Sequence, residues 1–290
     1  MGKALAETYA VARRVFEEAD EALAFPLSRL CFEGPEDQLK LTENTQPALL
    51  TVSTAAFAVL KGNGMVPDFV AGHSLGEYSA LVAAGSLQFA DAVKLVRNRG
   101  RYMQEAVPAG VGAMAAILKL PEGKLDAVLE QAAQGEVVSA ANLNTTEQVV
   151  IAGHAGAVNR AIELAKAAGA RRGVLLPVSA PFHCALMKPA QERLRADLDA
   201  TDFHDLAVPL VNNWQAVEVR TGAAAREGLY QQVPNPVRWV ESVRRLAAQG
   251  VLRCVEVGAG GVLTGLLRGI DPSLIGLRFG EPGELAALQG

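Results

Sequence analysis

Residues 71–80 read AGHSLGEYSA, and this stretch constrains the fold more than any other part of the chain. An apolar run, DFVAG, leads to Ser74, and a predicted helix from Leu75 to about Ala84 follows it. A GxSxG sequence between a strand and a helix is typical of a nucleophile elbow, a sharp turn that exposes the serine hydroxyl. Backbone N–H groups at the helix start can then stabilise an oxyanion. The alternative is that Ser74 merely caps the helix.

The segments on either side of this turn predict a larger α/β body. A first helix is predicted at the start of the chain, and a second has Thr45 at its N-cap, Pro47 in its first turn and Gly62 at its end. The apolar run before Ser74 is typical of a buried parallel strand. Further elements are predicted in VPLVNN, around 240–248 and in RCVEVGAGGVL.

A smaller unit is predicted between about Val107 and Ser179. The pattern there is strand, helix, strand, strand, helix, strand, with the strands in VGAMAAILKL, EVVSAANLN, QVVIAGH and RRGVLLPVS. This βαββαβ order is the ferredoxin-like motif. We therefore predict an α/β fold in which residues 1–106 and 180–290 form the large body and residues 107–179 form an inserted ferredoxin-like subdomain.

A nucleophilic serine needs a base, and the chain has four histidines. His73 adjoins Ser74, where neighbouring side chains normally point apart, while His154 and His204 have the surroundings of structural or surface residues. His183, in SAPFHCALM, lies where the chain returns to the large body and is the best candidate. An α/β-hydrolase places its acid and histidine late in the chain. No histidine follows His204 here, which weakens an esterase or lipase interpretation without removing it.

Arg99 lies on an apolar helix stripe. Phe89, Ala92, Val96, Arg99 and Met103 recur at intervals of three and four residues. A guanidinium in such a position is costly unless it is paired, and a carboxylate is its natural bidentate partner. That carboxylate belongs either to one of the protein's own acidic residues or to an acyl substrate.

Charge and composition exclude several classes of protein. The net charge of −4 provides no strongly basic field for nucleic acid. No His/Cys cluster has metal-ligand spacing, and no run approaches the roughly eighteen apolar residues of a membrane span. The start of the chain lacks the apolar core of a signal peptide. Cys31, Cys184 and Cys254 are far apart and odd in number, which favours reduced thiols in a cytoplasm.

Several stretches resemble the malonyl-CoA:acyl carrier protein transacylases of bacterial fatty-acid synthesis. They span nearly the whole chain in the family's order: TQPALL, AGHSLGEYSAL, RGRYMQEAVPAGVGAMAAIL, QVVIAGH, SAPFHCALMKPA, NPVRW and EVGAGGVLTGL. The resemblance implies a hydrolase-like parallel-sheet body with an inserted ferredoxin-like subdomain. It also implies transfer of a malonyl group from malonyl-CoA to the phosphopantetheine thiol of acyl carrier protein through a malonyl-serine.

The resemblance further implies a role for five residues. Ser74 would be the nucleophile and His183 its base, Arg99 would hold the malonyl carboxylate, and the Leu75 N–H would serve the oxyanion. In this family a backbone carbonyl orients the histidine, and the matching residue is Gln232 in YQQVPNPVRW. No metal or cofactor is implied. The expected partners are malonyl-CoA and holo acyl carrier protein, and we expect a cytoplasmic monomer that binds neither nucleic acid nor membrane.

The chain departs from the family pattern at its start. The family begins with a strand and a loop like FPGQGSQ, which supplies a second oxyanion N–H, and this sequence lacks both. A catalytically impaired remnant is therefore one open alternative, and a serine esterase or thioesterase that uses the same elbow is another. Restoring such a segment is expected to raise activity and melting temperature. Because the carrier is expected to be acidic, a local basic surface should dock it, with four candidates: Lys166, Arg171, Arg172 and Lys188.

Overall fold

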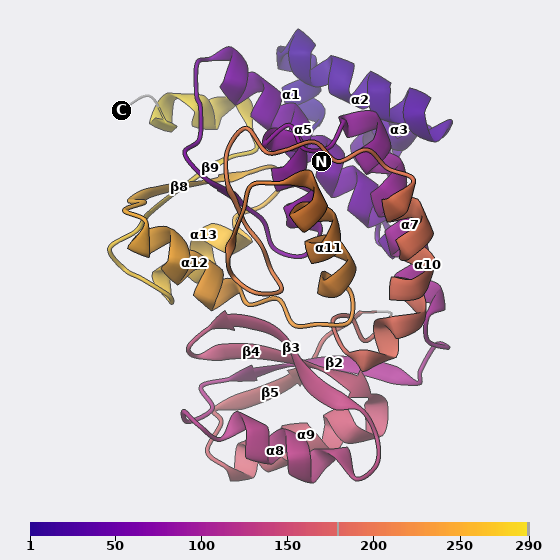
Figure 1. The fold of residues 1–290 in the computed structure, drawn as a ribbon, viewed down its shortest axis with the longest axis vertical. Helices are drawn as coiled ribbons and strands as arrows, with labels where there is room; N and C mark the ends of the chain where they lie inside the picture. The colour runs from indigo at the N-terminus through magenta and orange to yellow at the C-terminus, as the bar shows by residue number, and fades with distance from the viewer. Residues whose placement is uncertain (179, 289–290) are drawn as a thin grey trace.

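The computed structural model describes residues 1–178 and 180–288. Figure 1 shows two parts, a larger body that holds both ends of the chain and a smaller one below it. The smaller part contains β2 to β5 with α8 and α9. Within the described residues, no helix combines the length and apolar character that a membrane crossing needs.

The larger body contains short, mainly parallel strands. β1 (Val70–Ala71) pairs in parallel with β6 (Leu210–Val211), and β8 (Arg253–Val257) pairs in parallel with β9 (Ile275–Phe279). β7 (Glu218–Val219) differs from the prediction because it runs antiparallel to β6. The α/β class is confirmed, with this one antiparallel strand added to the parallel pairs.

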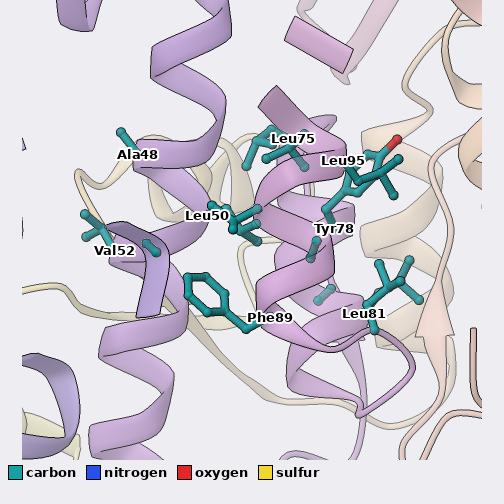
Figure 2. Packing of buried hydrophobic residues seen from close by; sticks show 14 of the residues in the cluster. Ala48, Leu50, Val52, Leu75, Tyr78, Leu81, Phe89 and Leu95 are labelled. Atoms are coloured by element: carbon teal, nitrogen blue, oxygen red, sulfur yellow. The ribbon is translucent and has the colours of Figure 1, made fainter. Parts of the chain in front are cut away.

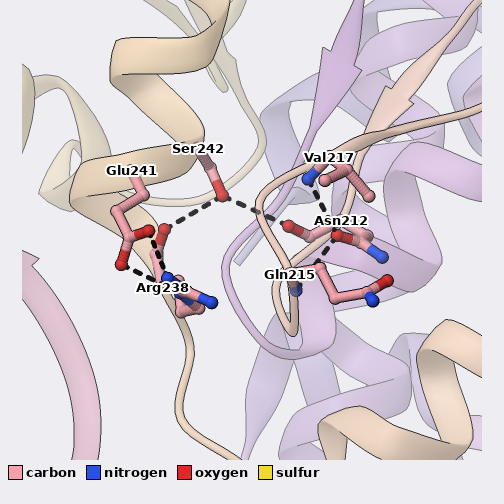
Figure 3. A network of polar contacts seen from close by, with 6 residues as sticks. All are labelled: Asn212, Gln215, Val217, Arg238, Glu241 and Ser242. Carbon is pink, nitrogen blue, oxygen red and sulfur yellow. Dashed lines mark hydrogen bonds and ion pairs between the residues drawn. The ribbon is translucent and has the colours of Figure 1, made fainter.

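A tight turn explains the direction of β7. The Asn212 side chain accepts hydrogen bonds from the backbone N–H groups of Gln215 (3.3 Å) and Val217 (3.2 Å), as Figure 3 shows. These bonds reverse the chain within a few residues, so the next strand returns beside β6. Ser242 donates to the Asn212 carbonyl at 3.2 Å and attaches the start of α12 to the same turn.

Helices surround these strands. Those in the larger body are α1 (Lys3–Thr8), α2 (Ala10–Leu23), α3 (Leu27–Glu33), α4 (Glu36–Leu39), α5 (Thr42–Gly62), α6 (Leu75–Ala83), α7 (Phe89–Glu105), α10 (Lys188–Asp199), α11 (Gly222–Gln232), α12 (Trp239–Ala248) and α13 (Val262–Arg268), with 3₁₀ turns at η1 (Ala185–Met187) and η2 (Pro282–Leu288). Figure 2 shows the centre of the core, where Leu50, Tyr78, Leu81, Phe89 and Leu95 gather. This apolar packing holds α5, α6 and α7 in fixed relative positions.

Two predicted helix limits were wrong. The first helix is broken at Tyr9, whose backbone is extended (φ −119°, ψ 117°). α5 begins at Thr42, so Thr45 is not its N-cap and Pro47 lies beyond the first turn. The Thr45 hydroxyl instead donates to the carbonyls of Leu39 and Leu41, at 2.5 and 3.1 Å. These bonds tie the helix to the segment before it, which local sequence signals do not reveal.

The smaller body has the predicted βαββαβ order. Its elements are β2 (Gly112–Leu118), α8 (Leu125–Ala133), β3 (Val138–Thr145), β4 (Gln148–His154), α9 (Ala155–Ala167) and β5 (Arg172–Leu175). The strands lie in the order β3-β4-β2-β5, and each neighbouring pair is antiparallel. The domain limits of 107–179 stay a prediction, and Ser179 lies outside the described residues.

Each face of this four-stranded sheet is buried against different partners. Ala115, Ile117 and Ile151 pack under α8 and α9. Met114, Val150 and Ala152 point to the other face and share a cluster with Cys184 of the larger body. A backbone bridge also joins β3 to the segment after α11, because the Leu143 N–H donates to Val237 and the Val237 N–H donates to Ala141, both at 2.9 Å. The smaller body therefore contacts the larger one next to His183, at Cys184, and shortly after Gln232, at Val237.

Candidate active site

Ser74 lies in a strained turn between β1 and α6. Its backbone has φ 52° and ψ −107°, a conformation that is rarely adopted by a residue with a side chain. A Cβ atom on Gly72 would lie 2.0 Å from the backbone carbonyl carbon and oxygen of Gly76, so only glycine permits this approach. A Cβ atom on Gly76 would meet no heavy atom within 4 Å. Thus the first glycine of the motif closes the turn, and the second has no steric need to be glycine.

This difference predicts opposite results for two alanine variants. Gly72→Ala should destabilise the protein by about 1–3 kcal/mol through backbone overlap and move Ser74 out of position. A misplacement of this kind lowers reaction rates by about 10²-fold. Gly76→Ala should stabilise α6 by up to about 1 kcal/mol. Thermal melting and the rate of Ser74 acylation measure both effects, and equal losses in the two variants would contradict this account of the turn.

His183 is hydrogen-bonded to the Ser74 hydroxyl. The Ser74 Oγ lies 2.7 Å from His183 Nε2, and His183 Nδ1 lies 3.0 Å from the backbone carbonyl oxygen of Gln232. Because a carbonyl can only accept, Nδ1 carries the proton and Nε2 is left to accept from the serine. Burial, reinforced by the charge of Arg99, lowers the pKa of His183 to about 3. The imidazole is therefore neutral near pH 7 and able to take the serine proton.

The N-terminus of α6 presents an N–H donor beside the serine. The Leu75 N–H has no acceptor in the part of the chain that the structure describes. The Ser74 N–H is already used, because it donates to Asn213 Oδ1 at 2.6 Å. The free Leu75 donor, at the positive end of the helix dipole, can stabilise negative charge on an acyl oxygen.

Arg99 is buried within reach of the same hydroxyl. It lies on the predicted apolar stripe of α7 and is only 2% exposed. Its Nη1 donates to Gln46 Oε1 at 2.6 Å, and its Nη2 donates to Gln232 Oε1 at 2.8 Å and to Ser74 Oγ at 3.1 Å. The Tyr78 ring lies 5.4 Å from the guanidinium carbon.

The charge of Arg99 has no direct counterion. Among the described residues, no carboxylate forms an ion pair with its guanidinium, and its Nε has no partner. Burial lowers the pKa of Arg99, but a guanidinium remains protonated in proteins. The first of the two sequence alternatives, an ion pair with the protein's own acid, is absent from these residues. The cation is left available to a carboxylate that arrives with a ligand.

Sequence reasoning missed three polar residues of the site. Gln46 on α5 accepts a hydrogen bond from Arg99. The backbone N–H of Asn213 donates to the Glu77 carboxylate at 3.0 Å. All three are buried. Gln46 and Glu77 could have been found in the sequence, because each is a polar residue on a helix face that is otherwise apolar.

The other histidines have structural surroundings. His73 Nε2 lies 2.9 Å from Asn144 Oδ1 on β3, which joins the turn at Ser74 to the smaller body. His154 Nδ1 accepts the Val137 N–H at 2.9 Å. His204 is exposed. These positions agree with the sequence expectation that none of the three is the base.

The four basic residues predicted to dock a carrier are exposed. Lys166 forms an ion pair with Glu163 at 2.8 Å, so part of its charge is already neutralised. Arg171 lies immediately before β5, Arg172 is its first residue, and Lys188 is the first residue of α10. No contact in the structure tests their role.

Comparisons with known proteins agree on one kind of enzyme. Residues 1–269 match the family described as "Acyl transferase domain". The chain is 49% identical over 284 residues to the malonyl CoA-acyl carrier protein transacylase of Escherichia coli K12, covering 98% of this chain and 92% of the relative. An acyl carrier protein S-malonyltransferase from Vibrio cholerae has the same fold, with a TM-score of 0.97, 46% identity and coverage of 99% and 94% of the two chains. A malonyl-transacylase in complex with a type II PKS acyl-carrier protein gives a TM-score of 0.95, with 44% identity and coverage of 98% and 92%.

Proposed function

The chain belongs to the acyl transferase domain family and, within it, to the malonyl CoA-acyl carrier protein transacylases, and we propose that its reaction runs through Ser74, His183 and Arg99. It is an acyltransferase that moves a malonyl group from malonyl-CoA to the phosphopantetheine thiol of acyl carrier protein, for fatty-acid synthesis.

The first half-reaction loads the serine. Ser74 Oγ attacks the thioester carbon of malonyl-CoA while its proton passes to His183 Nε2, 2.7 Å away. The negative charge that develops on the carbonyl oxygen faces the Leu75 N–H. The C–S bond then breaks, His183 returns the proton to the departing CoA sulfur, and a malonyl-serine ester remains.

The second half-reaction reverses these steps with a different thiol. The phosphopantetheine thiol of the carrier gives its proton to His183 and attacks the ester carbon. The C–O bond to Ser74 breaks, and the proton returns to Oγ. The Gln232 carbonyl, 3.0 Å from Nδ1, keeps the imidazole in the required tautomer throughout.

The main support for this proposal is that the charge of Arg99 lies beside the nucleophile without a carboxylate partner among the described residues. A buried guanidinium without a carboxylate partner is unfavourable in the free protein. The free carboxylate of a malonyl group on Ser74 would supply that partner. It would lie within reach of Arg99, because Arg99 Nη2 is 3.1 Å from Ser74 Oγ. An uncharged acyl group would not, which gives a physical reason for malonyl selectivity.

Product analysis separates transfer from hydrolysis. The enzyme is incubated with malonyl-CoA and either holo or apo acyl carrier protein, and malonyl-carrier and free malonate are quantified. We expect malonyl-carrier with the holo form and little malonate in either reaction. Free malonate formed at the same rate with holo and apo carrier would support a serine hydrolase, and binding without turnover would support an impaired remnant.

Charge reversal at the exposed basic residues tests carrier docking. Arg171→Glu, Arg172→Glu and Lys188→Glu should weaken transfer to the acidic carrier and leave acylation by malonyl-CoA intact, because rim charges mainly affect encounter with a charged partner. Lys166→Glu should have a smaller effect because of its ion pair with Glu163. Lys3→Glu on α1 is the control. The two half-reaction rates are measured separately, and equal loss in both would exclude a docking role.

We propose a monomer that acts in the cytoplasm. Ser74, His183, Arg99 and Gln232 meet within a single copy of the chain, which supports a monomer. Cys31, Cys184 and Cys254 are free thiols, which fits a reducing compartment. Light scattering would test the first statement, and fractionation of the cells that express the protein would test the second.

A further inference from the structure

Glu77 is a buried carboxyl group that the mechanism above does not use. It lies in the first turn of α6, three positions after Ser74, and is 0% exposed. Its Oε2 accepts from Gln232 Nε2 at 2.8 Å and from the Asn213 N–H at 3.0 Å. Its Oε1 has no hydrogen-bond partner among the described residues. A carboxyl placed so deeply is costly, which calls for a reason for its presence.

Glu77 is the nearest of three acceptors that together fix which way the Gln232 amide points. Gln232 Nε2 faces three oxygens, those of Glu77 (2.8 Å), the Ser74 carbonyl (3.0 Å) and the Asn213 side chain (3.4 Å). The other end of the amide, Oε1, therefore faces Arg99 Nη2 at 2.8 Å. A flipped amide would point an NH₂ group at the guanidinium, so two donors would face each other without an acceptor.

Gln232 also connects this amide to the base. Its backbone carbonyl accepts from His183 Nδ1 at 3.0 Å, while its side-chain carbonyl accepts from Arg99. One residue at the C-terminal end of α11 thus contacts both the proposed base and the proposed selector of the acyl group. Glu77 Oε2 is the nearest acceptor for its side-chain amide at 2.8 Å, and this bond is strongest when the Glu77 carboxyl is ionised.

The electrostatics of Glu77 agree with this geometry. Burial raises its pKa to about 7, against the opposing influence of the Gln232 and Asn213 hydrogen bonds and of Arg99. Tyr78, on the same helix, is a further titratable group that interacts electrostatically with Glu77. Either protonation state of Glu77 retains an oxygen that accepts from Gln232, so its acceptor function persists across neutral pH.

We propose that Glu77 is a positioning residue for malonyl transfer, which holds the Gln232 amide so that its oxygen supports Arg99 and its backbone carbonyl supports His183. This inference rests on the proposed function. Glu77 would then contribute to the selectivity for a carboxylate-bearing acyl group indirectly, through Gln232, without a hydrogen bond of its own to Arg99.

Two matched variants test the acceptor. Glu77→Gln keeps a side-chain oxygen for Gln232, whereas Glu77→Met has a similar volume and no oxygen. Loading of Ser74 with malonyl and with acetyl groups is measured from the two CoA esters by mass spectrometry. Glu77→Met should lower the malonyl-to-acetyl ratio by at least about tenfold, the effect of losing a hydrogen bond that supports a charged group. Glu77→Gln should change the ratio by less than about threefold, because its side-chain oxygen can still accept the hydrogen bond from Gln232.

A double-mutant cycle with Gln232→Ala separates positioning from general stability. If Glu77 acts through the Gln232 amide, Glu77→Met should produce no further change in the ratio once that amide is gone. An unchanged ratio in folded Glu77→Met, or the same drop in the Gln232→Ala background, would overturn the inference. If Glu77→Met does not fold, a drop of tenfold or more in folded Glu77→Gln would overturn it. Wild-type protein that loads no malonyl group would instead refute the proposed function.

Discussion

Ser74→Ala is expected to form no acyl-enzyme with malonyl-CoA. His183 is placed to deprotonate this hydroxyl, because Ser74 Oγ lies 2.7 Å from its Nε2. The fold should survive, since removing the hydroxyl leaves the strained backbone of the turn and its Asn213 bond in place. Intact-mass spectrometry of the variant after incubation with malonyl-CoA provides the measurement.

His183→Ala tests the base in the same assay. Acylation should slow by about 10²–10⁴-fold, the usual contribution of a positioned general base. His204→Ala is the matched control, because His204 is an exposed histidine and should load at the wild-type rate. A malonyl adduct at the wild-type rate in either Ser74→Ala or His183→Ala would show that the reaction uses other residues.

Arg99→Ala should abolish most of the preference for malonyl groups. Truncating one partner of a desolvated charge pair costs about 2–5 kcal/mol, which corresponds to a loss of roughly 30- to several-thousand-fold in malonyl loading. Acetyl loading should be kept or increased, because no unpaired cation then remains beside Ser74. Arg99→Lys should recover only part of the malonyl reaction, since an ammonium cannot form the bidentate fork.

A neighbouring arginine provides the control for this result. Arg97 lies two residues earlier on α7, with its guanidinium carbon 4.2 Å from the centre of the Phe25 ring, away from the site. Arg97→Ala should leave the malonyl-to-acetyl ratio unchanged. Equal loss of both acyl groups in Arg99→Ala, or loss of neither, would mean that Arg99 is a structural residue.

Elements with strong local periodicity could be predicted from the sequence. QVVIAGH became β4, Gln148–His154, and all five residues of the α7 stripe are buried. The break at Tyr9 and the early start of α5 could not be predicted, because they depend on contacts with other segments. The antiparallel β7 likewise depends on the turn made by Asn212, whose side chain gives no sign of its bonding partners in the sequence.

In the candidate site, too, some residues could be predicted from the sequence and others could not. Ser74 is marked by a local motif, and Arg99 by a charge on an apolar stripe. Gln232 could be assigned only by resemblance, because the group that contacts His183 is a backbone carbonyl and every residue has one. Gln46 and Asn213 contact the site across large separations in sequence, 53 and 139 residues respectively, and no periodic pattern encodes such contacts.

We expect that Ser74 holds a malonyl group and passes it to a carrier thiol. The most direct test is intact-mass spectrometry of wild-type protein mixed with malonyl-CoA, freed of excess ester and divided between holo carrier and buffer, with peptide mapping of the adduct. We expect one malonyl group on Ser74 that persists in buffer and disappears with holo carrier as malonyl-carrier forms. No adduct, an adduct on another residue, or equal loss in buffer and with carrier would contradict this expectation.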